Sequence, residues 1–179
     1  MVTREVSDCY LEVHARGVTG GTVRPMEMYR SLKGGQWNDM YIVDIDGTIA
    51  NIGHRLHHIQ GDVKNWDKFY ESMIEDFPIV YTIQLLRCLR EPLVYITGRP
   101  ERYRKLTIQW FSMYQVPLGG LLMRKDGDRR PDYVVKEELL TENLDSHAVV
   151  HGVFEDRQQC VDMWRKKGFI VYQVADGRY

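Results

Sequence analysis

The chain has 179 residues, of which 44% are hydrophobic and 27% are charged, as in an ordinary globular protein rather than a disordered or fibrous one. Its 24 Lys and Arg against 25 Asp and Glu give a formal net charge of -1, which excludes a strongly basic protein that attracts nucleic acid by its overall charge. Any surface that binds anions must therefore be local.

The N-terminus, MVTREVSDCY, carries charges where a secretory signal needs an apolar segment, and no apolar run approaches the ~18 residues of a membrane span. The three cysteines, Cys9, Cys88 and Cys160, are too few and too widely spaced for a disulfide framework or a zinc knuckle. We expect a cytoplasmic protein with no membrane partner.

Residues 1–39 differ from the rest of the chain, because GVTGGTV and KGGQ interrupt any regular periodicity. We expect an N-terminal appendage here, followed by one domain over residues 40–179. A hairpin, a partly ordered leader and an arm that binds a partner or a second copy of the chain all fit this composition.

From Met40 onward, β-rich runs alternate with stretches of helical spacing. The β-rich runs cover residues 40–43, 93–97, 120–123, 149–154 and 169–174. The helical stretches cover residues 79–90, 102–114, 133–140 and 157–167. This alternation predicts an α/β fold with a Rossmann-like parallel sheet of about five strands and helices on both faces. In such sheets, ligands bind at the carboxyl ends of the strands.

About thirty residues separate the first predicted strand from the first regular helix, which is longer than a normal connection. We predict a small cap insertion over about 51–78. Trp66, Phe69 and Tyr70 have helical spacing there, which favours a small core of the cap over base stacking. The HRLHH cluster could suggest zinc, but neither a cysteine nor a third spaced histidine accompanies His54 and His58.

Charged and polar residues stand where the predicted strands end. They are Asp44, Asp46 and Thr48 after the first strand, Thr97, Gly98 and Arg99 after the second, and Glu155, Asp156 and Arg157 after the fourth. An Asp-Gly pair alone is equally typical of a simple turn. Carboxylates gathered at one edge repel one another unless a cation binds them, and oxygen ligands favour a hard ion such as Mg²⁺.

The order of VDIDGTIA, YITGRP, DYVVKEEL and VFEDRQQCVDMW resembles the haloacid dehalogenase (HAD) superfamily of phosphotransferases. Within it, RRPDYVVKEELL and EDRQQCVDMWRKKGFIVYQVADG are similar to the 3'-phosphatase domain of phage-type polynucleotide kinase/phosphatase. The similarity covers about residues 40–179 and implies a HAD-like phosphatase domain there. No G-x-x-x-x-G-K-[ST] loop occurs, so we expect no kinase activity.

The resemblance implies that Asp44 is the nucleophile, which forms an aspartyl phosphate, and that Asp46 is the general acid and base. It places Mg²⁺ on Asp44, on the backbone carbonyl of Asp46 and on Asp156. Thr97 and Lys136 would hold the phosphate oxygens.

Gly98 stands with Thr97 among the expected phosphate-binding residues. The closer resemblance adds four residues near the substrate or the metal: Arg99, Arg55, Asp132 and Glu155. Arg55 would clamp the substrate, and Arg99 would reach the substrate or a neighbouring acid. Asp132 would orient the catalytic lysine or cap its helix, and we favour neither. Glu155 stands where an aspartate is usual, so we expect it to contact the metal through water.

Two groups of basic residues follow strand ends: Arg99, Arg102, Arg104 and Lys105, then Arg124, Lys125, Arg129 and Arg130. A groove for a nucleic acid backbone and a solvated face explain them equally well.

The leading hypothesis is a Mg²⁺-dependent phosphomonoesterase that removes 3'-phosphates from nucleic acid ends in repair. The alternative is a mononucleotide phosphatase with the same mechanism. A binding module without turnover is less favoured, because Asp44, Asp46 and Lys136 are all present.

Overall fold

The computed structural model describes residues 39–144 and 147–177, so the appendage expected over residues 1–39 lies, apart from Asp39, outside the described residues. The main sheet has five parallel strands in the order β5-β4-β1-β6-β7. They are β1 (Asp39–Val43), β4 (Leu93–Pro100), β5 (Gly119–Arg124), β6 (Val149–Glu155) and β7 (Val171–Gln173). The predicted α/β fold with a parallel, Rossmann-like sheet is therefore confirmed.

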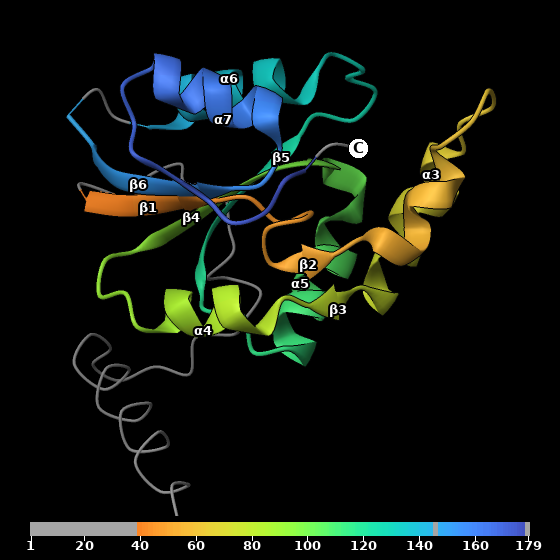
Figure 1. Ribbon diagram of the computed structural model, residues 1–179, viewed down its shortest axis with the longest axis horizontal. Coiled ribbons are helices and arrows are strands. Elements are labelled where there is room, and N and C mark those ends of the chain that lie inside the picture. The colour runs from red at the N-terminus through yellow and green to blue at the C-terminus, as the bar shows by residue number, and fades with distance from the viewer. Residues whose placement is uncertain (1–38, 145–146, 178–179) are drawn as a thin grey trace, which may run out of the picture.

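Four helices cover the sheet: α4 (Val80–Arg87), α5 (Arg104–Met113), α6 (Asp132–Asn143) and α7 (Gln158–Lys166). Figure 1 shows α6 and α7 on one face and α4 and α5 on the other. The expected helix over residues 79–90 ends earlier, at Arg87. The expected helix over 102–114 begins instead with a 3₁₀ turn, η3 (Glu101–Tyr103).

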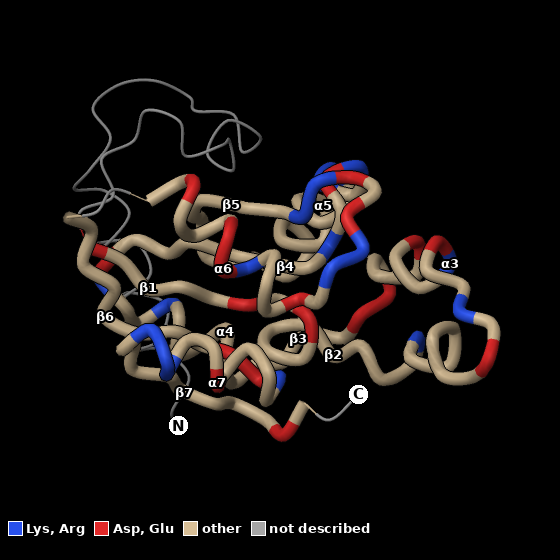
Figure 2. The backbone as a smooth tube through the Cα atoms, turned by 90° about the horizontal axis from the view of Figure 1, so that it is seen from above, with Lys and Arg blue, Asp and Glu red and all other residues tan. Residues whose placement is uncertain are grey.

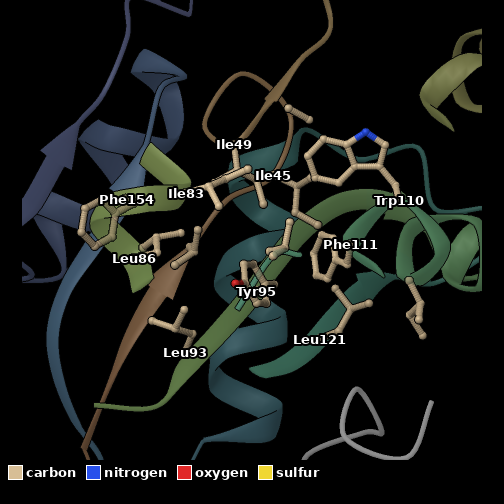
Figure 3. Close-up of a cluster of buried hydrophobic side chains, with 14 of the residues drawn as sticks. Ile45, Ile49, Ile83, Leu86, Leu93, Tyr95, Trp110, Phe111, Leu121 and Phe154 are labelled. Atoms are coloured by element: carbon tan, nitrogen blue, oxygen red, sulfur yellow. The ribbon is translucent and has the colours of Figure 1, made fainter. Parts of the chain in front are cut away.

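The strands are apolar on both faces, as a sheet covered by helices requires. Neighbouring residues of β1 point to opposite sides, so Val43 packs with α4 and α5 while Ile42 packs with α6 and α7. Figure 3 shows the first of these cores, in which Tyr95, Phe111 and other buried side chains meet.

Residues 50–78 leave the main sheet after β1 and return before α4. A short antiparallel pair, β2 (Ala50–Asn51) with β3 (Phe77–Pro78), closes this segment. Between them lie η1 (Gly53–His58), α3 (Trp66–Glu71) and η2 (Ser72–Glu75). Figure 1 shows α3 extending well beyond one end of the sheet.

The central strand β1 lies between β4 and β6, and Val43 at its end pairs with Tyr95 and Phe154. The chain builds the sheet outward from β1 on one side and then crosses to the other, so the strand order reverses at β1. Ligand sites lie at such reversal points. Among the described residues, no helix has the length and apolar character needed to cross a bilayer.

Candidate active site

Asp44 follows β1 directly and is buried, with 4% of its surface exposed. The chain then turns sharply, and Gly47 adopts a left-handed backbone conformation with φ of 92°, which favours glycine. The turn brings the Thr48 hydroxyl back over the strand end. There it donates to Asp44 Oδ2 at 3.3 Å and to Asp156 Oδ1 at 3.2 Å, linking the ends of β1 and β6.

Lys136 extends from α6 into this acidic cluster and is 1% exposed. Its Nζ lies 2.7 Å from Asp44 Oδ1, 2.8 Å from Glu155 Oε2 and 3.2 Å from Asp132 Oδ2. Burial alone would lower the pKa of Lys136, but the three carboxylates raise it well above its usual value. The ammonium group is therefore charged at neutral pH.

Of the residues that the structure describes, Asp44, Glu155 and Asp156 form a group that could hold a metal ion, with carboxylate oxygens within 4.8 Å of one another. Burial raises the pKa of Asp44 well above its usual range, Lys136 opposes this shift, and Glu155 adds to it. Three carboxylates contact the Lys136 ammonium group, and Asp156 lies beside Asp44 and Glu155 as a fourth acid. Buried oxygen ligands with surplus negative charge fit a hard divalent cation such as Mg²⁺.

The Asp46 carboxylate is not among the three that form this cluster, and it binds two arginines. Its Oδ1 accepts hydrogen bonds from Arg55 Nη2 at 2.6 Å and from Arg99 Nη2 at 2.5 Å. A second acid, Asp76, accepts from Arg55 Nε at 2.7 Å and from Arg99 Nη2 at 3.2 Å. Burial would raise the pKa of Asp46, but the two guanidinium groups hold it well below its usual range.

The structure places Arg55 differently from the substrate clamp that the sequence suggested. Its side chain has no exposed surface, and its guanidinium group stacks 4.2 Å from the centre of the Phe69 ring. Its Nη1 donates to the Phe69 carbonyl at 3.2 Å, and its other nitrogens bind Asp46 and Asp76. The geometry therefore favours a role for Arg55 in holding the Asp46 carboxylate in place. Arg99 does the same, which agrees with the neighbouring-acid interpretation.

Gly98 lies where β4 approaches α6. A side chain at this position would overlap the carboxylate of Asp132, so only glycine allows the close approach. Arg124 joins the two elements, donating to the Gly98 carbonyl at 2.8 Å and to Asp132 Oδ1 at 3.1 Å. Within the described part of the chain, no side chain caps the N-terminus of α6. Because Asp132 instead lies against Lys136, the structure favours a role in orienting the lysine over a role in capping the helix.

Two other predicted site residues, Thr97 and Glu155, lie at the carboxyl ends of the strands. Thr97 is completely buried, and its hydroxyl accepts a hydrogen bond from the Arg99 amide at 3.2 Å. Glu155 Oε1 accepts from the amides of Asp156 and Arg157, each at 3.2 Å, while its Oε2 binds the lysine. Glu155 thus fixes the lysine and the turn after β6, and its carboxylate also belongs to the acidic cluster with Asp44 and Asp156.

The sequence analysis did not assign roles to Thr48, Asp76 and Arg124. Thr48 was noted at the strand end, and its proximity to Asp156 depends on the turn at Gly47. Asp76 is one of several acids in the 51–78 segment, and no pattern distinguishes it from the others. Arg124 was counted only as a basic surface residue, although it is 8% exposed.

The histidines of HRLHH do not form a metal site within the described residues. His54 Nε2 lies 2.9 Å from Asp76 Oδ1, and the rings of His57 and His58 contact each other.

The two basic groups are largely neutralised by neighbouring acids. Arg102 binds Asp67 at 2.8 Å, and Arg130 binds Asp128 and Glu138, both at 2.6 Å. Figure 2 shows acidic and basic stretches side by side on the loops near α5. These pairs favour the solvated face over a continuous cationic groove.

An Asp-x-Asp pair at the end of the central strand, whose first aspartate is buried against a buried lysine with further acids beside it, defines the class: this is an HAD-type phosphatase fold. Residues 38–179 match the family model described as "Polynucleotide kinase PNKP phosphatase domain", and the chain belongs to this family. The chain is therefore a phosphatase of the HAD superfamily, as its sequence indicated.

Two solved structures of complexes contain a chain similar to this one. The first, "Structure of Pnkp1/Rnl/Hen1 complex", is 26% identical with a TM-score of 0.66, over 79% of this chain and 47% of that chain. The second, "Structure of the Pnkp1/Rnl/Hen1 RNA repair complex", is 26% identical with a TM-score of 0.67, over 80% and 44%. This chain thus spans less than half the length of these matched chains.

Proposed function

We propose that the protein is a Mg²⁺-dependent phosphomonoesterase that removes 3'-phosphates from nucleic acid ends. The supporting observation is the buried contact of Asp44 with Lys136 at the end of the central strand, with Asp156 beside it. Family membership supports the reaction class, and the similarity to a chain of an RNA repair complex supports nucleic acid ends as the substrate.

In this proposal Asp44 attacks phosphorus, so a bond forms between its carboxylate oxygen and phosphorus while the ester bond breaks. Asp46 donates its proton to the departing alkoxide and then takes a proton from the water that hydrolyses the aspartyl phosphate. The two aspartates are two residues apart at the strand end. Burial alone would raise the pKa of Asp46, but Arg55 and Arg99 hold it well below its usual range, so Asp46 rests as the carboxylate that can accept a proton from the attacking water. Its acid step therefore uses a proton that Asp46 takes up from solvent before the alkoxide departs.

Lys136 and Thr97 would bind the phosphate oxygens, with Gly98 and Arg99 shaping the turn beside them. Lys136 also reduces the repulsion between the nucleophilic carboxylate and the anionic substrate. Mg²⁺, held by Asp44, the Asp46 carbonyl and Asp156, would neutralise charge on the phosphate.

We also propose that the 51–78 segment acts as a cap of the domain over residues 40–179. Hydrogen bonds join α3 to β4 and to η3, the turn that follows it: Tyr70 donates to the Gly98 carbonyl at 3.4 Å, and Asp67 accepts from Arg102 at 2.8 Å. A cap held there would exclude water from the phosphate and restrict the leaving group.

A substrate panel tests the proposed specificity. With Mg²⁺, we expect kcat/KM for a 3'-phosphorylated oligonucleotide to exceed that for 3'- and 5'-mononucleotides by roughly tenfold or more, a difference of about 1.4 kcal/mol. Chelation with EDTA should remove activity, and added Mg²⁺ should restore it. Equal or greater activity on the mononucleotides would instead support the mononucleotide phosphatase.

A further inference from the structure

Three aromatic rings lie side by side where the 51–78 segment meets the turn after β4. Trp66 and Tyr70 are one helical turn apart on α3, with their rings stacked at 6.1 Å and 26°. Tyr103 of η3 lies across from them, with its ring 5.3 Å from that of Tyr70. We call these three residues the aromatic shelf.

The inner end of the shelf touches the candidate active site. The Tyr70 hydroxyl donates to the carbonyl of Gly98, which follows the phosphate-binding Thr97. Arg124, the partner of Asp132, donates to the same carbonyl at 2.8 Å. The shelf therefore begins beside the residues proposed to bind phosphate and leads outward from them.

The outer end of the shelf is open to solvent. Phe69 forms the small core of the 51–78 segment and is 5% exposed, as expected from the sequence. Trp66, by contrast, is 45% exposed, although the indole is among the largest apolar side chains. Packing of the segment itself therefore accounts for Phe69 but leaves much of the Trp66 ring facing solvent.

Polar contacts hold the two sides of the shelf together. Asp67 of α3 accepts hydrogen bonds from Arg102 at 2.8 Å and from the Tyr103 hydroxyl at 3.3 Å. The Arg102 guanidinium group also stacks 4.9 Å from the centre of the Tyr103 ring. The rings are thus ordered before any ligand arrives, which lowers the entropic cost of binding.

We propose that the aromatic shelf stacks the 3'-terminal nucleobase of a strand whose 3'-phosphate occupies the site at Thr97 and Lys136. This inference rests on the proposed function. It adds a binding site for the 3'-terminal nucleobase, the part of the substrate that the catalytic residues do not contact. Stacking accepts any base, because every base has an aromatic face. An enzyme that processes strand ends of arbitrary sequence needs this kind of contact rather than hydrogen bonds to base edges.

The test compares two 3'-phosphorylated oligonucleotides, one with a normal 3'-terminal nucleotide and one in which that nucleotide is abasic. For the unmodified protein we expect kcat/KM to be about tenfold higher on the substrate with the base. In Trp66→Ala this ratio should fall to about one. Trp66→Leu keeps an apolar side chain but removes the ring face, so its ratio should also fall. Tyr81→Ala is the matched control, because Tyr81 is an 86% exposed aromatic residue on α4.

A ratio near one for the unmodified protein would overturn the inference, and so would a ratio that stays near ten in Trp66→Ala and Trp66→Leu. A fall of the same size in Tyr81→Ala would also contradict it. Failure of the unmodified protein to hydrolyse either oligonucleotide would refute the proposed function itself, which separates the two claims.

Discussion

Replacing Asp44 by asparagine is expected to lower kcat by roughly 10³-fold or more, which corresponds to about 4 kcal/mol of transition-state stabilisation. The amide cannot form the aspartyl phosphate, and it removes one of the proposed metal ligands. The change is nearly isosteric, and Asp44 is buried among other acids, so the fold should tolerate it. Steady-state hydrolysis of a 3'-phosphorylated oligonucleotide measures the effect.

Asp62→Asn serves as the control, because Asp62 is exposed and belongs to the 51–78 segment. It should retain the activity of the unmodified protein. Circular dichroism and thermal unfolding should show that Asp44→Asn is folded. A folded Asp44→Asn protein with more than about a tenth of the original kcat would refute the assignment of the nucleophile.

Lys136→Met is expected to affect both activity and stability. We expect kcat to fall by about 10²- to 10³-fold, as when a preorganised donor to the transition state is removed. Because Lys136 is buried against three carboxylates, its loss leaves an uncompensated cluster of acids. Breaking such a buried pair costs about 3–5 kcal/mol of the free energy of unfolding, which urea titration measures.

Mg²⁺ should restore part of that stability, since a bound cation supplies positive charge to the same carboxylates. Lys125→Met is the matched control, because the Lys125 side chain is 64% exposed and binds surface acids. Exposed ion pairs of this kind contribute at most about 1 kcal/mol to the free energy of unfolding. If both variants lost the same stability, the buried cluster around Lys136 would not have the energetic importance that its geometry indicates.

Much of the fold follows from residue patterns that act over short distances. The apolar runs before Asp44, Thr97 and Glu155 predict three parallel strands, and the rule for parallel sheets places their ends together. That reasoning brought Asp44 and Asp156 to one edge, where the structure places them within one acidic cluster. The placement of Lys136 came from the family resemblance, because helical spacing alone does not say which face of α6 meets the sheet.

The remaining features depend on side-chain pairing between distant segments. Arg55 lies in the 51–78 segment, whose path over the sheet no local pattern determines, so its burial against Asp46 and Asp76 could not be predicted. The pairing of the basic residues with acids could not be predicted for the same reason. Arg102 and Asp67 are 35 residues apart, and only the docking of α3 against η3 brings them together.

The most direct test of this account is anomalous diffraction from crystals of the protein grown with Mn²⁺, which substitutes for Mg²⁺ at oxygen sites. We predict one strong peak at the end of β1, about 2.2 Å from carboxylate oxygens of Asp44 and Asp156, and no such peak in Asp156→Asn crystals. A peak bound elsewhere, with Asp44 and Asp156 both unligated, would contradict the proposed centre.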